Sequence, residues 1–247
     1  MSQSAQAGHG TGMSRIPPLE KMALLLDFDG TLVDIAPSPD AVIVPEGLKE
    51  TLLRLRDACG EALAIITGRP IAQIDHFLPD VPFAIAGEHG AVVRRRPGGP
   101  AEHAALPAVP PEWIAAARDL AQAWPGVHVE HKTDGFVLHF RAAPEAGQAL
   151  HDAAASWIAS HETGEHFRLL ESKMAWEIRP AGIDKGQAVR LLMETWPFTG
   201  RIPVFIGDDR TDEDAIREVE AMGGAGLRIP ADFPTPSAFR NWLKELN

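Results

Sequence analysis

The sequence predicts an α/β fold, in which a Rossmann-like core has a parallel sheet with helices on both faces and carries an inserted α/β layer with an antiparallel sheet. Three observations support this prediction. Short apolar segments recur and run directly into polar residues, helical patterns separate these segments, and the middle of the chain has a different order of elements. The apolar segments are 22–26, 62–66 and 202–206. Strands that are apolar throughout are typical of parallel sheets, which are covered on both faces.

The first part of the core alternates between strands and helices. The strand at 22–26 precedes a helical pattern over 46–58, where leucines recur at helical spacing. The strand at 62–66 precedes a second predicted helix over 70–78, which has a proline near its start. This alternation indicates a parallel sheet with crossover helices, in which ligands bind outside the carboxyl ends of the strands.

The middle of the chain follows another pattern. Residues 97–111 are rich in proline, glycine and alanine, which predicts a linker. A helix, two strands, a helix and two more strands are expected after it, at 112–124, 127–130, 135–141, 144–160, 167–170 and 174–178. This order predicts a small layer with an antiparallel sheet. The core pattern then returns with a predicted helix over 185–196.

These patterns divide the 247 residues into three parts. Residues 1–18 are expected to form a disordered tail, because their first part is small and polar and has no apolar stretch. Residues 19–108 and 182–247 form the predicted core. Residues 109–181 form the predicted inserted domain.

Charge and cysteine content exclude several classes of protein. Lysine and arginine number 23 against 34 aspartates and glutamates, a formal net charge of -11 that disfavours nucleic-acid binding. No early apolar run approaches the roughly 20 residues of a membrane helix. The single cysteine, Cys59, excludes an internal disulfide and a thiolate zinc cluster. We therefore expect a cytoplasmic protein without a nucleic-acid or membrane partner; its oligomeric state is left open, with a monomer favoured.

The segment DFDGT at 27–31 places two carboxylates directly after a predicted strand. Asp27 and Asp29 are able to point into the same space where the strand gives way to a loop, and Gly30 supplies backbone freedom there. Bare carboxylates in that position repel each other, whereas a divalent cation between them removes the cost. Mg²⁺ fits best, because it is commonly held by one or two carboxylates together with phosphate oxygens and water. The alternative is that these aspartates only solvate a strand end or cap a helix.

The segment GDDRTDED at 207–214 strengthens the prediction of a cation site. It follows another apolar strand and contains five acidic residues, a costly cluster unless a cation neutralises part of it. Asp208 and Asp212 are the candidates for this role. Glu213 and Asp214 also suit a helix N-terminus, where negative charge is favourable.

Two further segments supply groups that suit a phosphoryl ligand. Thr67 follows the strand at 62–66 with Gly68 behind it, and offers a hydroxyl and main-chain donors. Lys185, in GIDKG at 182–186, offers a fixed positive charge. A lone lysine at a helix start is more often only solvated, so either segment alone indicates little.

The four segments together, in this order, resemble the haloacid dehalogenase (HAD) superfamily of aspartate-nucleophile phosphatases. DFDGT is similar to its first motif, ITGR at 66–69 to its second, GIDKG to its third and GDDRTDE to its fourth. The resemblance spans nearly the whole chain from Lys21. It implies that Asp27 attacks phosphorus, that Asp29 is the general acid and later the general base, and that Thr67 and Lys185 bind the phosphoryl group.

The resemblance also implies a ligand set for Mg²⁺. The ion would be held by the carboxylates of Asp27 and Asp208 and by the main-chain carbonyl of Asp29. Asp212 would be the fourth residue of this metal set and would support the other ligands. Because the inserted layer lies between the second and third motifs, it resembles the larger, C2-type α/β cap of this superfamily, which selects the leaving group.

Within this superfamily, four segments resemble trehalose-6-phosphate phosphatases: EHK at 130–132, HFR at 139–141, KMAWEIRP at 173–180 and GEHGA at 87–91. This resemblance implies that Glu130, Lys132 and Glu177 bind sugar hydroxyls. The predicted substrate-binding residues also include Gly68, Arg69 and Lys173. One departure is Ser172, which stands where the family usually has glycine. The alternative for Glu130 and Lys132 is a cross-strand or solvated ion pair.

The function implied is the hydrolysis of trehalose 6-phosphate to trehalose and inorganic phosphate, with Mg²⁺ as cofactor and an aspartyl-phosphate intermediate. The partner implied is therefore a phosphorylated disaccharide. Two alternatives stay open at this stage. One is another sugar phosphatase of the superfamily, acting on sucrose phosphate or a mannosyl phosphate. The other is a non-catalytic module that binds a phosphosugar.

Overall fold

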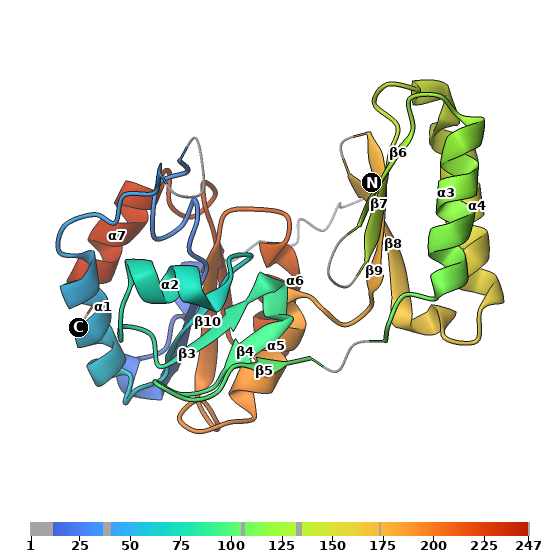
Figure 1. Cartoon of the computed structure of the whole chain (residues 1–247). Coiled ribbons are helices and arrows are strands. Elements are labelled where there is room, and N and C mark those ends of the chain that lie inside the picture. The colour runs from blue at the N-terminus through green and yellow to red at the C-terminus, as the bar shows by residue number, and fades with distance from the viewer. Residues whose placement is uncertain (1–11, 37–40, 105–106, 132–134, 173, 247) are drawn as a thin grey trace, which may run out of the picture. The chain divides into compact units, whose positions relative to one another are not determined.

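The computed structural model describes residues 12–36, 41–104, 107–131, 135–172 and 174–246. These residues divide into two compact units (Figure 1). The first comprises the described residues up to Ala104 and from Ile183 onward, and the second those from Ala105 to Gly182. Of the predicted tail, residues 1–11 lie outside the described residues, and Gly12–Arg15 forms a short 3-10 helix.

The first unit contains a seven-stranded sheet in the order β11-β10-β1-β2-β3-β4-β5. The strands from β11 to β3 in this order are parallel, and β4 and β5 add an antiparallel edge. The fold class expected from the sequence is therefore confirmed. The strands are β1 (Met22–Leu26), β2 (Leu63–Ile66), β3 (Ala84–Gly87), β4 (Val92–Arg94), β5 (Glu102–His103), β10 (Ile202–Gly207) and β11 (Ala225–Arg228).

The chain leaves the central pair of strands in two directions. It passes from β1 through α1 to β2 on one side, and from β10 through α6 to β11 on the other. Because such crossovers are right-handed, α1 and α6 lie on opposite faces of the sheet. Helix α7 packs beside α1, and α5 beside α6. The helices are α1 (Leu48–Ala58), α2 (Ile71–Phe77), α5 (Lys185–Met193), α6 (Asp212–Ala221) and α7 (Pro236–Glu245).

The pair β1 and β10 is therefore the point where the strand order reverses. In such sheets the crevice at the carboxyl ends of the reversing strands is the usual ligand site. Every residue of β1 is buried, and β10 is buried from its second residue onward. This burial explains why both strands read as continuous apolar runs in the sequence.

The edge of the first sheet differs from the prediction. The stretch 97–111 was expected to be a linker, but it contains β5, which pairs antiparallel with β4 so that Glu102 lies opposite Val93. Both residues of β5 are exposed. A two-residue exposed strand has no apolar pattern from which it can be predicted. The helix expected over 185–196 ends earlier, at Met193, ahead of Pro197, which cannot continue a helix.

The second unit has the predicted order of helix, two strands, helix and two strands. Its antiparallel sheet has the order β6-β7-β9-β8. Figure 1 shows α3 and α4 side by side along one face of this sheet, and Trp113 and Leu150 from these helices share a buried cluster with Phe136 and Ile178. The elements are α3 (Pro111–Ala123), β6 (His128–His131), β7 (Phe136–His139), α4 (Gly147–Ser160), β8 (Phe167–Ser172) and β9 (Ala175–Pro180).

A membrane span was not expected from the sequence. Across the described ranges, no helix combines the length and the apolar character that crossing a bilayer requires.

Candidate active site

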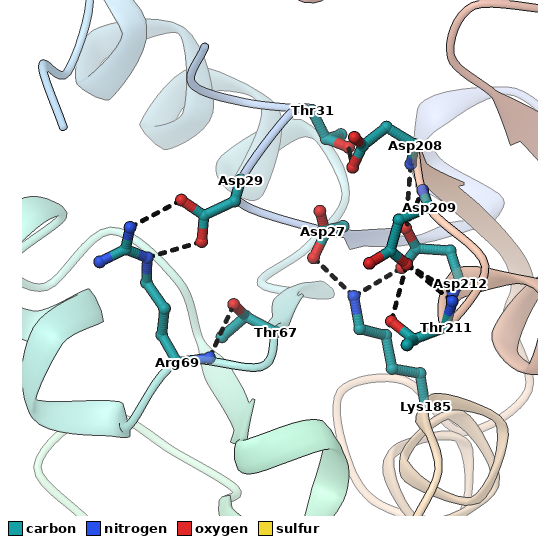
Figure 2. Close-up of polar contacts among 10 residues, drawn as sticks. All are labelled: Asp27, Asp29, Thr31, Thr67, Arg69, Lys185, Asp208, Asp209, Thr211 and Asp212. Carbon is teal, nitrogen blue, oxygen red and sulfur yellow. Dashed lines mark hydrogen bonds and ion pairs between the residues drawn. The ribbon is translucent and has the colours of Figure 1, made fainter. Parts of the chain in front are cut away.

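Two of the predicted acids follow the central strands of the first sheet. Asp27 comes directly after β1, and Asp208 comes directly after β10. In the parallel register Leu26 lies beside Ile206, and the Asp27 N–H donates to the Ile206 carbonyl at 3.0 Å. Strand pairing alone therefore brings residues about 180 positions apart in the chain to one edge of the sheet (Figure 2).

Lys185 joins two of these acids. It is the first residue of α5, and Asp184 fixes the start of that helix by accepting from the Gln187 N–H at 2.7 Å. The Lys185 Nζ donates to Asp27 Oδ1 at 2.7 Å and to Asp212 Oδ1 at 2.6 Å. Lys185, Asp27 and Asp212 are 3%, 4% and 0% exposed, so the three charges meet away from water.

Asp212 also holds the loop that carries Asp208. Its second oxygen, Oδ2, accepts from the N–H groups of Asp208 at 2.9 Å and Asp209 at 3.0 Å. Gly207 leaves room for this arrangement, since a Cβ there would lie 2.2 Å from Asp212 Cγ. Both oxygens of Asp212 therefore have partners, Oδ1 in Lys185 and Oδ2 in the loop.

The acidic cluster contains more negative charge than its one lysine can neutralise. Burial raises the pKa of Asp27 to about 8, although Lys185 lowers it. Burial, together with the nearby charges of Asp212 and Asp209, raises the pKa of Asp208 to about 6. Burial alone would lower the pKa of Lys185, but the two carboxylates that it contacts raise it above its usual range. One ammonium group does not balance the acids that surround it.

This deficit identifies a candidate metal centre. Among the described residues, Asp27, Asp208 and Asp212 each offer a carboxylate oxygen, and these oxygens lie within 4.8 Å of one another. Oxygen donors of this kind suit a hard cation. The cluster is therefore able to hold a metal ion at the point where the strand order reverses.

Asp29 lies beside this cluster but contacts a different cation. Its two carboxylate oxygens accept from Arg69 Nε at 2.6 Å and from Arg69 Nη2 at 2.7 Å (Figure 2). Thr67 is buried, and its Oγ1 accepts from the Arg69 N–H at 3.2 Å. Gly68 packs against the ring of His89, which a Cβ would approach to 2.8 Å. Arg69 was expected among the substrate-binding residues, and its pairing with Asp29 was not predicted from the sequence.

The predicted sugar-binding residues belong to the second unit. Glu130 on β6 and Glu177 on β9 both lie opposite Val137 of β7, so the two glutamates point to the same face of the sheet. Phe136 and Leu138, which alternate with Val137, face the helices. The glutamates therefore project from the face that the helices leave open. Lys132 and Lys173 lie outside the described residues.

His139 is a contact of Glu130 that the sequence did not predict. Its Nε2 lies 2.8 Å from Glu130 Oε2. The two residues are diagonal neighbours on adjacent strands, because Glu130 lies opposite Val137. Strand register was needed to find this pair, since in the sequence the two residues stand nine positions apart.

Comparisons with known proteins agree on one family. The family model described as trehalose-phosphatase matches residues 25–235. A probable trehalose-phosphate phosphatase of Sinorhizobium fredii is 39% identical over 224 residues, which cover 89% of this chain and 82% of that protein. The trehalose-6-phosphate phosphatase of Escherichia coli is 37% identical over 218 residues, covering 85% of this chain and 77% of that protein.

A solved structure is similar over nearly the same range. The trehalose-6-phosphate phosphatase of Aspergillus fumigatus, in its crystal form 3, superimposes with a TM-score of 0.75 and 25% identity. The match covers 92% of each chain. Both the core and the inserted layer therefore have counterparts in that enzyme.

Proposed function

This chain belongs to the trehalose-phosphatase family, and we propose that it hydrolyses trehalose 6-phosphate to trehalose and inorganic phosphate through a phosphorylated Asp27. The family resemblance predicted from four sequence motifs is thereby confirmed, as is the class of enzyme, a phosphoric monoester hydrolase. The observation that carries the proposed mechanism is the buried Asp27, held beside Lys185 where the strand order reverses.

Mg²⁺ is the proposed cofactor, and the donor set fits it. Asp27 and Asp208 offer carboxylate oxygens, and their raised pKa values reflect missing positive charge. These two residues and the main-chain carbonyl of Asp29 would hold the ion. Asp212 would support Asp208, because its own oxygens already bind Lys185 and main-chain N–H groups. When bound, Mg²⁺ neutralises charge on the phosphoryl oxygens and favours the ionised form of Asp27.

In the first proposed step, Asp27 attacks phosphorus. Lys185 binds Oδ1 of Asp27, which leaves Oδ2 as the attacking oxygen. The bond between phosphorus and the sugar oxygen breaks, and protonated Asp29 gives its proton to that oxygen, so trehalose leaves as a neutral alcohol. Asp29 is then a carboxylate, and Asp27 carries the phosphoryl group.

In the second proposed step, water attacks the same phosphorus. The bond to Asp27 breaks, inorganic phosphate leaves, and the Asp29 carboxylate takes a proton from the water. Asp27 returns to its ionised form and Asp29 to its protonated form, so the pair is ready for the next substrate. Each proton that Asp29 gives to one sugar is thus replaced by a proton from the following water.

Stabilisation of the transferring phosphoryl group comes from fixed donors. Uncatalysed hydrolysis of phosphate monoesters is so slow that the site has to lower the barrier by roughly 20 kcal/mol or more. Lys185 and the Thr67 hydroxyl are the proposed side-chain donors, and main-chain N–H groups at the strand ends add to them. Because these groups are buried, they act in a medium of low dielectric, where each contact is stronger than in water.

The proposed role of residues 109–181 is that of a cap domain that selects the sugar. Glu130, Glu177 and Lys132 are the proposed ligands of sugar hydroxyls, and Gly68 and Lys173 remain proposed substrate contacts. The support for Lys132 and Lys173 is their sequence resemblance alone. For the glutamates, the shared open face of the antiparallel sheet adds support. A site built to pair with hydroxyls discriminates strongly, because other substrates leave its polar groups unpaired.

A phosphate-release assay tests this function. The purified chain is given trehalose 6-phosphate, sucrose 6-phosphate and a mannosyl phosphate, each with Mg²⁺ and with EDTA. We expect kcat/KM to be highest for trehalose 6-phosphate by at least about tenfold, and expect EDTA to abolish release until Mg²⁺ is restored. Comparable rates across the panel would overturn the substrate assignment. Binding without phosphate release would indicate a non-catalytic module.

A further inference from the structure

The guanidinium of Arg69 is fixed by contacts on several sides. Two of its nitrogens bind Asp29, and its third, Nη1, donates to Gln73 Oε1 at 2.8 Å. Its Cζ lies over two aromatic rings, 5.6 Å from the centroid of Phe28 and 5.3 Å from that of Phe77. The side chain of Arg69 is only 10% exposed. Arginine in such surroundings is a rigid, planar pair of donors.

Asp29 is the more accessible member of this pair. Its side chain is 38% exposed, and both of its oxygens accept hydrogen bonds from one rigid fork. Each carboxylate oxygen has a second lone pair, which the fork leaves available. The geometry therefore sets the direction in which Asp29 presents its remaining acceptor sites.

From this geometry we propose that Arg69 is a positioning residue for Asp29, which it orients as the base that takes a proton from the water hydrolysing the phosphorylated Asp27. The inference rests on the proposed function, and it replaces the substrate-binding role that the sequence suggested for Arg69. A protonated Asp29 would direct an O–H donor at one of the arginine donors. The paired arrangement therefore suits the acceptor role of the second step, and the acid form used in the first step has to turn one oxygen away from the fork.

With p-nitrophenyl phosphate as the substrate, the phosphorylation of Asp27 and the hydrolysis of the phosphorylated Asp27 can be measured separately. Nitrophenolate leaves without help from an acid, so the first step does not need Asp29, whereas the second step needs it with any substrate. In Arg69→Gln we expect the second step to slow by on the order of 100-fold. A stopped-flow trace would then contain a burst of nearly one nitrophenolate per active site, followed by a slow steady state. KM for trehalose 6-phosphate would not rise.

Two further variants test whether the effect comes from the orientation of Asp29, from the charge of Arg69 or from a loss of folding. Arg69→Lys keeps the charge but has no fork, so we expect a burst close to that of Arg69→Gln. Arg94 makes a similar fork to Asp75 in the same unit, at 2.7 Å and 2.5 Å, away from the acidic cluster. Arg94→Gln is therefore the matched control, and its steady state should follow the wild type without a new burst. The burst amplitude also counts the correctly folded sites.

A double-mutant cycle tests whether Arg69 acts through Asp29. We expect Arg69→Gln to have almost no effect on the second step in an Asp29→Asn background, because the group that it positions is already lost. Multiplicative effects, or a raised KM in Arg69→Gln without a burst, would overturn the inference and favour direct binding of substrate. If the wild type hydrolyses neither substrate, the proposed function fails instead, so the two failures are distinguishable.

Discussion

Asp27 is buried, and its carboxylate is paired with the ammonium group of Lys185. At 4% exposure it depends on Lys185 for its charge balance, and Lys185 is shared with Asp212. The raised pKa of Asp27 means that its ionised form is unfavourable in the folded protein without a further cation. The proposed nucleophile is therefore buried at a cost in stability, as is common at functional sites.

Asp27→Asn separates these two properties. The amide has the same shape but no nucleophilic oxygen and no charge to bury, so we expect phosphate release to fall to background while the melting temperature stays equal or rises. A phosphate assay and a thermal melt in EDTA measure the two effects. Asp75→Asn, which alters an ion pair away from the acidic cluster, is the matched control and should retain activity. Near-normal hydrolysis by Asp27→Asn would contradict the covalent mechanism.

The site residues differ in how far the sequence predicted them. Asp27 and Asp208 follow apolar strands, and parallel strands deliver their carboxyl ends to one edge, so their convergence could be predicted. The partners of Arg69 could not be predicted in this way. Whether that side chain turns to Asp29 or to open solvent depends on how Phe28, Phe77 and Gln73 pack around it. No spacing in the sequence records this packing.

At the scale of single elements, the first residues of two helices supply side chains of the candidate active site. Helix α5 places Lys185, its first residue, through the cap that Asp184 makes at its N-terminus. Asp212 is likewise the first residue of α6, but the N-cap residue of that helix, Thr211, makes no side-chain cap hydrogen bond. Strands β1 and β10 were predictable because they are apolar throughout. Strands β5 and β11 were not. Strand β5 has only two residues, both exposed, and β11 has the sequence AGLR, in which a glycine weakens the apolar strand pattern.

Asp184→Ala tests the contribution of the α5 cap. We expect it to cost about 1 kcal/mol of unfolding free energy, and also to lower kcat because Lys185 loses its fixed position. Thr235→Ala removes a similar cap, where Thr235 Oγ1 accepts from the Ala238 N–H at 3.1 Å at the start of α7. Urea denaturation should give similar costs for both variants, and only Asp184→Ala should lose activity. Equal activities would argue against a positioning role for the cap.

The antiparallel sheet of the second unit supports a prediction about specificity. Glu177→Gln on its open face should raise KM for trehalose 6-phosphate by roughly 10- to 100-fold and leave kcat/KM for p-nitrophenyl phosphate nearly unchanged, because that substrate has no sugar hydroxyls. Glu171→Gln on β8 is the control, since Glu171 lies opposite Trp176, whose indole contacts α4. Steady-state kinetics of the two variants with each of the two substrates measure these effects. Equal losses with both substrates would place Glu177 outside sugar recognition.

At the scale of the whole molecule, the acidic cluster links stability to pH and to metal. A carboxyl whose pKa is raised on folding binds its proton more tightly in the folded state than in the unfolded chain. Folding raises the pKa of Asp208 from 3.8 to about 6 and the pKa of Asp27 from 3.8 to about 8. The metal-free protein therefore loses stability from these two groups as the pH increases from 3.8 through those values. Mg²⁺ bound at the proposed site would favour the ionised forms and oppose this loss of stability.

The melting temperature in Mg²⁺ minus that in EDTA should therefore grow between about pH 5 and about pH 8. Because other titrating groups affect both samples alike, the difference isolates the cluster. Asp208→Asn removes a proposed ligand and should flatten the dependence. A difference that stays constant or shrinks as the pH rises would place the bound cation elsewhere.

Trapping the enzyme during turnover is the most direct test of the central claim that Asp27 becomes phosphorylated. Borohydride reduces an acyl phosphate to an alcohol, so an aspartyl-phosphate becomes homoserine, which peptide mass spectrometry locates. With trehalose 6-phosphate and Mg²⁺ present, we predict homoserine at position 27, and none when substrate is left out or EDTA is added. Steady phosphate release with an unmodified Asp27, or reduction at a different acid, would contradict the account.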